Sequence, residues 1–211
     1  MTKPSVVLTA AYAEAVRYAA TLHADQSRKS TTIPYISHLL AVSALVLEAG
    51  GDEEMAIAAL LHDGPEDQGG TEVLDEIRDR FGPRVARIVE GCTDSFAEDP
   101  ADKEDWKVRK RAYLEHLKHV EVDGLTVSLA DKLHNARSIV TDLLISKETT
   151  WARFRPSVDE ILWYYQSILA IGESRKGPCF LVVNLGEAIQ EMTSLAALHP
   201  APPRTSHTQP E

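Results

Sequence analysis

The sequence predicts an all-α fold, a single-domain helical bundle, on three observations. Apolar residues recur at spacings of three and four through most of the chain, as in helices that bury one face. The short apolar run CFLVV, residues 179–183, has no alternating partner nearby with which to form a sheet. At 211 residues, 44% hydrophobic and 26% charged, the chain can form one substantial core and has an ordinary globular composition.

Local signals divide the first half of the chain into consecutive helices. Pro34 suits the first turn of a helix, and Gly50 suits the end of one. Asp52 and Thr71 are candidate N-caps, because their side-chain oxygens can accept hydrogen bonds from the first backbone N–H groups of a helix. With the apolar stripes between them, these signals predict helices within 11–26, 34–50, 52–63, 71–82 and 83–94.

The second half begins with a polar, proline-containing stretch, which we interpret as a surface loop over 96–106. It leads into a helix that is expected to end near Val120. Further helical patterns follow over 122–144, in a long segment over 148–172, and over 181–198. We expect an N-terminal extension over 1–8, one domain over 9–197 and a proline-rich disordered tail over 198–211.

The net charge bears on which partners the protein can bind, and the cysteine content bears on its cellular compartment. With 22 basic and 32 acidic residues, the net charge is −10, which argues against a general nucleic-acid binder. A small phosphorylated substrate remains compatible, because a local basic cluster or a metal can overcome the overall charge. Cys92 and Cys179 fit no metal or redox spacing, and no stretch resembles a signal peptide or a membrane span. We therefore expect a cytoplasmic protein without a nucleic-acid or membrane partner; its oligomeric state stays open.

Three segments place potential metal ligands at the ends of apolar helices. They are RKSTTIPYISH with His38, LLHDGPEDQGG with His62 and Asp63, and SLADKLHN with Asp131. Two imidazoles and two carboxylates suit Mn²⁺, Fe²⁺ or Zn²⁺ and leave positions for water. The alternative for the isolated residues is structural: His38 would bond a backbone carbonyl, and Asp131 would pair with Lys132. The four together, in this order, favour a metal site.

The same motifs carry a family resemblance. The series H…HD…D is similar to that of the HD-domain phosphohydrolases, and HDxxED narrows the resemblance. Together with QSRK, PYISH, FGPRVARIVEGCTD and LADKLHN, it resembles the hydrolase domain of RelA/SpoT-type proteins, and most of all the stand-alone small alarmone hydrolases. The resemblance covers about residues 9–170 and implies a helical bundle of the HD-domain type.

What the resemblance implies is a (p)ppGpp hydrolase that removes the 3′-pyrophosphate to give GDP or GTP. It implies that one Mn²⁺ is bound by four ligands and activates the attacking water, while an acidic pair handles protons. It also implies a nucleotide pocket whose arginine stacks on a purine and whose lysine meets phosphate charge. Carried over by position, the ligands are His38, His62, Asp63 and Asp131, the catalytic pair is Glu66 and Asp67, and the substrate-binding residues are Arg28, Lys29, Asn135 and Arg137.

Two departures from the family pattern qualify these expectations. The stretch RKSTTIPY is one residue longer than usual, so the loop beside the base pocket is expected to differ. HDGPED carries Gly64 and Pro65 where the family has aliphatic residues. Pro65 would clash with the carbonyl of Leu61 in a continuous helix, so we predict that the helix ends or kinks at 62–64.

Other functions stay open at this stage. The altered loop permits another 3′- or 2′-phosphorylated nucleotide, such as an adenosine alarmone or NADPH, as the substrate. A non-catalytic HD module that binds a nucleotide is a further alternative, although the four ligand types and the acidic pair count against it. Tyr164, Tyr165 and His23 are interpreted as packed residues, and His134 is expected to brace Asp131 or to pack.

Overall fold

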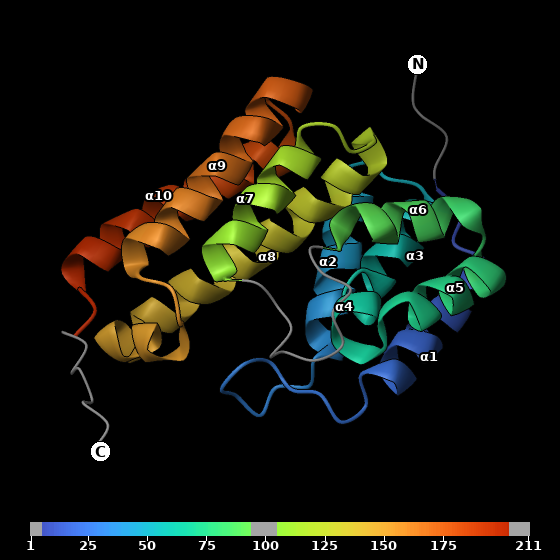
Figure 1. The fold of residues 1–211 in the computed structure, drawn as a ribbon, viewed down its shortest axis with the longest axis horizontal. Helices are drawn as coiled ribbons and strands as arrows, with labels where there is room; N and C mark the ends of the chain where they lie inside the picture. Colours follow the sequence, from blue (N-terminus) through green and yellow to red (C-terminus); the bar gives the residue numbers. More distant parts are fainter. Residues whose placement is uncertain (1–5, 94–104, 203–211) are drawn as a thin grey trace.

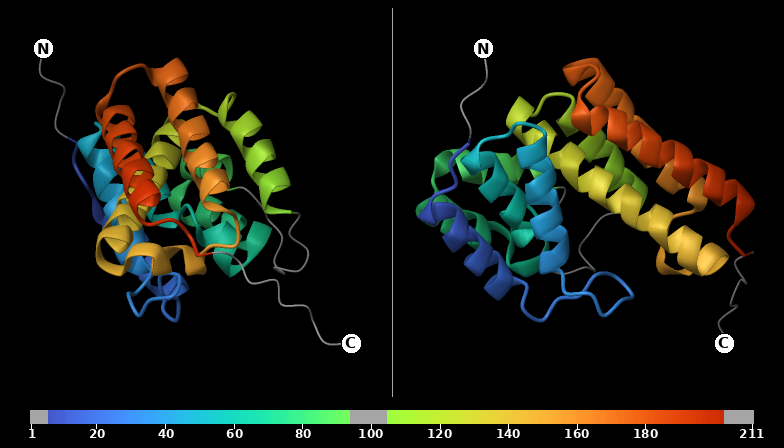
Figure 2. Two further views of the ribbon diagram at one scale, coloured as in Figure 1. Left: turned by 90° about the vertical axis from the view of Figure 1, so that its left-hand side faces the viewer. Right: turned by 180° about the vertical axis from the view of Figure 1, so that it is seen from behind.

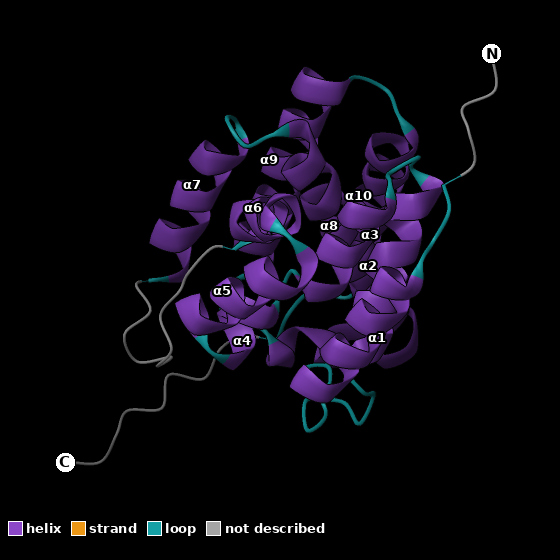
Figure 3. Cartoon of the chain, turned by 90° about the vertical axis from the view of Figure 1, so that its right-hand side faces the viewer, coloured by secondary structure: helices purple, strands orange, loops and turns teal. Residues whose placement is uncertain are grey.

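The structure is a computed structural model that describes residues 6–93 and 105–202. All regular elements within these ranges are helical, apart from an isolated antiparallel bridge between Ser27 and Pro34 (Figure 3). The all-α prediction is therefore confirmed. None of the helices in the described ranges is long and apolar enough to cross a membrane.

The helices form two groups on either side of a long central helix (Figure 1). The first group comprises α1 (Ala10–Leu22), α2 (Ile36–Glu48), α3 (Glu53–Leu61), α4 (Gly64–Gln68), α5 (Gly70–Phe81) and α6 (Pro83–Cys92). The second comprises α7 (Trp106–Leu117), α9 (Val158–Lys176) and α10 (Phe180–Leu198). The central helix α8 (Val122–Ser146) contacts α2, α3 and α6 on one side and α9 and α10 on the other. Seen from behind, α10 runs beside α8 (Figure 2).

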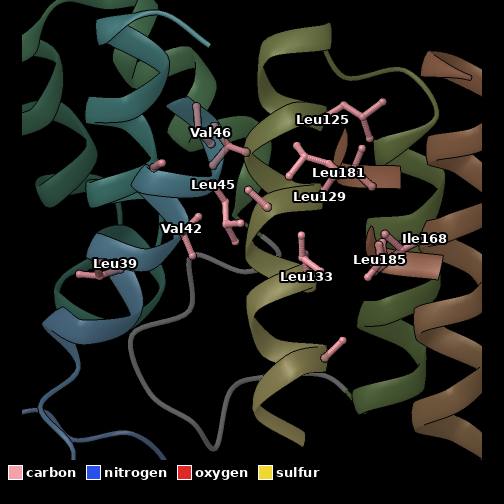
Figure 4. Close-up of a cluster of buried hydrophobic side chains, with 14 of the residues drawn as sticks. Leu39, Val42, Leu45, Val46, Leu125, Leu129, Leu133, Ile168, Leu181 and Leu185 are labelled. Carbon is pink, nitrogen blue, oxygen red and sulfur yellow. The ribbon is translucent and has the colours of Figure 1, made fainter. Parts of the chain in front are cut away.

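The hydrophobic core lies along α8. Leu125, Leu129 and Leu133 are fully buried, and they project between α2 and the pair α9–α10 (Figure 4). Gly172 lets α9 approach closely, since a Cβ atom there would lie 3.0 Å from Cδ2 of Leu129. Burying apolar surface on both sides makes α8 the element that joins the two groups.

Of the two predicted N-caps, Asp52 is confirmed and Thr71 is wrong. The Asp52 side chain accepts a hydrogen bond from the Met55 N–H and caps α3, as predicted. Thr71 does not cap α5, because that helix begins one residue earlier, at Gly70, with Gly69 in the N-cap position. Gly69 has φ 151°, a backbone conformation that glycine adopts without strain and threonine does not.

The segment over 148–172 is divided between two elements. A 3₁₀ helix, Lys147–Arg153, ends before Pro156, and α9 begins at Val158. Ser157 and Glu160 form a capping box, in which each side chain bonds the backbone N–H of the other residue. The predicted surface loop, extension and tail lie mostly outside the described residues.

We expect Leu129→Ala to lower the free energy of unfolding by about 2–5 kcal/mol, because it removes a fully buried side chain and leaves a cavity. Leu144→Ala is the matched control on the same helix, since Leu144 is 57% exposed and its loss should change stability by less than about 0.5 kcal/mol. Denaturant unfolding of both variants measures the difference. Equal effects would contradict the assignment of the core.

Candidate metal centre and adjoining cavity

Three helical segments bring the predicted ligands together. His38 lies in the first turn of α2, His62 directly follows α3, and Asp131 lies midway along α8. One ligand atom from each of these residues falls within 4.8 Å of the others. The fourth predicted ligand, Asp63, places Oδ2 3.4 Å from Nε2 of His38 and 3.2 Å from Nε2 of His62. Three of the predicted ligands therefore converge, and the Asp63 carboxylate lies against the two imidazoles of this group.

Each imidazole turns Nε2 toward the two carboxylates. Asp131 Oδ1 lies 3.3 Å from Nε2 of His38 and 3.7 Å from Nε2 of His62. Both Nε2 atoms are buried and have no hydrogen-bond partner among the described residues. Two buried nitrogen lone pairs and two carboxylate oxygens are a donor set that fits a divalent transition metal.

The other ring nitrogens are held from behind. His62 donates from Nδ1 to the Ala59 carbonyl at 2.8 Å, which places the lone pair of the neutral ring on Nε2. Nδ1 of His38 lies 2.8 Å from Nδ1 of His134. The predicted alternative, a bond from His38 to a backbone carbonyl, is not what the structure has. Outer contacts of this kind orient metal-ligating histidines.

The carboxylates are also fixed by neighbours. Asp131 pairs through Oδ2 with Lys132 at 2.5 Å, as the structural alternative required, but this pairing leaves Oδ1 directed at the imidazoles. Tyr35 donates from its hydroxyl to Oδ2 of Asp63 at 2.7 Å. Each acid thus has one oxygen near both imidazoles and at least one partner that restrains its rotation.

Burial and charge act in opposite directions at these groups. Burial alone would raise the pKa of Asp131, but Lys132 and the two imidazoles hold that pKa well below its usual range. For Asp63, His62 and His38 likewise outweigh burial, and the pKa is lowered. Burial disfavours a charged His62, yet Asp63 and Asp131 raise its pKa to about 9. The centre without metal therefore attracts a positive charge.

The helix break predicted at 62–64 is confirmed. α3 ends at Leu61, α4 begins at Gly64, and Pro65 occupies the first turn of α4, where its missing N–H costs no helical hydrogen bond. A Cβ atom on Gly64 would lie 3.1 Å from Leu22 Cδ2, so a side chain there would press on α1.

The acidic pair lies on α4, beside the four-ligand cluster and not within it. Glu66 is half-buried, and Asp67 is exposed. Asp67 accepts a hydrogen bond from Nε2 of Gln26 at 2.8 Å, which fixes the direction of one carboxylate oxygen. The catalytic role of the pair remains a prediction.

A cavity of about 550 Å³ adjoins the centre, within the size range of small-ligand sites. All four predicted substrate-binding residues line it, which are Arg28, Lys29, Asn135 and Arg137. Burial, with Arg155 and Arg153 nearby, lowers the pKa of Lys29. The cavity therefore has a cationic lining in a chain whose net charge is −10.

Two side chains connect the cavity with the centre. His134 lines the cavity and contacts His38, and Asn135 lines it and donates from Nδ2 to Oδ1 of Asp131. Arg28 in turn donates to Oδ1 of Asn135 at 2.9 Å. A ligand in the cavity would thus lie against groups that touch the predicted metal ligands.

Three contacts of the site were not predicted. Tyr35 donates to Asp63, Gln26 donates to Asp67, and His134, which was expected to brace Asp131 or to pack, contacts His38. Their positions within PYISH, QSRK and LADKLHN were the available signal, since each lies within one helical turn or loop of a predicted site residue. Tyr164 and Tyr165 are buried, as predicted, and Tyr165 also lines the cavity.

The chain is similar in sequence and in fold to known proteins. A family model described as HD domain matches residues 15–155. The chain is 38% identical over 134 residues to guanosine-3′,5′-bis(diphosphate) 3′-pyrophosphohydrolase MESH1 of Danio rerio, covering 62% of this chain and 70% of the relative. It is 41% identical over 130 residues to the protein of the same name from Xenopus tropicalis, covering 60% and 68%.

A solved structure, of a metazoan ortholog of SpoT that hydrolyses ppGpp, superposes with a TM-score of 0.68 at 26% identity. The superposition covers 90% of this chain and 98% of that one. The similarity thus extends over nearly all of that chain and includes both helix groups of this fold.

We expect His62→Ala and Asp63→Ala each to weaken divalent-metal binding by more than about 10- to 100-fold, the usual cost of losing only an outer contact of a metal ligand. Each change removes a donor from the centre and leaves the other three. Metal titration of chelator-treated protein measures the effect. His116→Ala is the control, because that ring bonds the Gly91 carbonyl and takes no part in the centre. Full metal affinity in either ligand variant would refute the ligand set.

Proposed function

The chain belongs to the HD-domain family, and on that premise we propose that it is a metal-dependent hydrolase of ppGpp and pppGpp. The reaction breaks the bond between the 3′ oxygen and its phosphorus, adds water, and releases pyrophosphate with GDP or GTP. One observation carries the proposal. Two buried imidazole nitrogens without a hydrogen-bond partner among the described residues lie beside a cavity with a cationic lining. The names of the relatives support the choice of substrate.

We propose that one Mn²⁺ is held by His38, His62, Asp63 and Asp131. When bound, it would supply a Lewis acid that lowers the pKa of water and offsets charge on a phosphoryl oxygen. The protein contributes the fixed donor directions, because Ala59, His134 and Lys132 restrain the ligands from behind. Rigid donors reduce the reorganisation that metal and substrate binding would otherwise require.

We assign the proton transfers to Glu66 and Asp67. Both follow the ligand pair within one helical turn, and Gln26 orients the Asp67 carboxylate. A carboxylate oxygen can accept the proton that the attacking water loses as its bond to phosphorus forms. The short helix α4, set apart from α3 by the break, carries the pair.

The cavity would hold the nucleotide. Arg28 is restrained by Asn135, and its guanidinium lies 5.9 Å from the centre of the Tyr35 ring, so it can present a flat face to a purine. Lys29 would meet phosphate charge, since an anion stabilises the charged form that burial disfavours. Arg137 is bonded to Asn184 of α10 at 2.6 Å, which fixes it at the cavity wall.

The domain that we propose to carry this activity spans residues 9–197. Cys92 and Cys179 are both free thiols, in keeping with the cytoplasmic location that we expect. The cavity lining alone does not select guanine over adenine, which makes the substrate screen the decisive experiment.

We expect the Mn²⁺-loaded protein to release pyrophosphate from ppGpp, and to do so faster than it releases phosphate products from ppApp or NADPH. The measurement is product release from each nucleotide under identical conditions, with chelator-treated protein as the control. Faster turnover of ppApp or NADPH would replace the substrate assignment. Binding of nucleotide without turnover of any of the three would favour a non-catalytic module.

We expect Glu66→Gln and Asp67→Asn to lower the single-turnover rate by about 100-fold or more, the scale of a positioned acid–base group. The amides keep size and polarity but cannot accept the proton, so metal content and nucleotide affinity should persist. Glu72→Gln, on an exposed position of α5, is the control. Wild-type rates in both variants would remove the acidic pair from the mechanism.

A further inference from the structure

His134 occupies a position that the proposed reaction does not yet use. It lies on α8 one turn after Asp131, it is half-buried, and it lines the nucleotide cavity. Its Nδ1 atom is 2.8 Å from Nδ1 of His38, and the two ring centroids are 4.8 Å apart. The contact joins α8 to α2 across 96 positions of sequence.

Two nitrogens at this distance must share one proton, and only one arrangement suits a metal ligand. If His134 donated from Nδ1, the proton of a neutral His38 would lie on Nε2, where it would block the lone pair. If His38 donates, its lone pair lies on Nε2, the buried atom that faces Asp63 and Asp131 without a hydrogen-bond partner. The proton of His134 is then on its own Nε2.

We infer that His134 is a positioning residue, which accepts the Nδ1–H of His38 and so fixes both the tautomer and the ring orientation of that ligand. The inference rests on the metal centre proposed above. His38 would then donate from Nδ1 to His134, just as His62 donates from Nδ1 to the Ala59 carbonyl. The difference is that the acceptor for His38 is a side chain, which a single substitution can remove.

The environment of His134 suits an acceptor. Ser138 bonds the backbone carbonyl of His134, so that hydroxyl is not the partner of its Nδ1. The position of the ring between α2 and α8 is thus determined by helix packing and by His38.

The test is calorimetric titration of chelator-treated protein with Mn²⁺ alone. We expect His134→Phe, which keeps a ring but has no acceptor, to weaken Mn²⁺ binding by about 10- to 100-fold. His134→Asn places an amide Oδ1 at the bond position of Nδ1 and should stay within about threefold of the wild type. His134→Leu, which has the shape of the asparagine variant but no acceptor, should behave like the phenylalanine variant and replaces it if that variant does not fold.

Thermal unfolding in chelator separates this role from a general loss of structure. The asparagine and leucine variants, which share a shape, should unfold at similar temperatures without metal and differ in Mn²⁺ affinity. Wild-type affinity in His134→Phe or His134→Leu, or equal losses in the asparagine and leucine variants, would overturn the inference and leave the metal centre standing. Failure of the wild type itself to bind Mn²⁺ would overturn both.

Discussion

The arrangement of the molecule depends on two buried imidazoles and two carboxylates that come together between three helical segments. Such groups are costly to bury unless a charge or a hydrogen bond compensates them. Here Lys132 compensates Oδ2 of Asp131, the Tyr35 hydroxyl compensates Oδ2 of Asp63, and the Ala59 carbonyl compensates Nδ1 of His62. Among the described residues the two Nε2 atoms have no hydrogen-bond partner and face the carboxylates, which is where a cation would bind.

Helix α8 explains how this centre is kept rigid and close to a ligand cavity. Its buried leucines fix its position between the two helix groups, as Figure 4 shows. On another face, Asp131, His134 and Asn135 follow at i, i+3 and i+4, so their side chains emerge on one side of the helix. One faces the metal centre, and the other two lie between the centre and the cavity. Core packing, metal binding and substrate binding are thus set by the same rigid element.

Helices and helix breaks could be predicted from the sequence, because they depend on neighbouring residues and on the periodic pattern of apolar residues. Apolar periodicity identified the long helices, and Pro65 predicted the break after α3 because a proline acts on its own helix. The Thr71 cap was wrong because a glycine two residues earlier adopts the required turn, and glycine is only modestly enriched at N-caps. The partners Tyr35, Gln26 and His134 were missed for a different reason. Each contact joins residues between 28 and 96 positions apart, which depends on how the helices pack.

The backbone around Gly64 and Pro65 shows what this departure from the family pattern does to the chain. Successive side chains on an α-helix point about 100° apart, since the helix has ~3.6 residues per turn. At Asp63 the backbone has φ −91° and ψ −6°, which departs from the helical value of ψ. That turn brings Oδ2 of Asp63 to 3.2 Å from Nε2 of His62. Pro65 then restarts a helix without needing an N–H partner, and Gly64 fits against Leu22 without a side chain. Gly64 and Pro65 therefore begin α4, the short helix that carries the acidic pair, directly after His62 and Asp63.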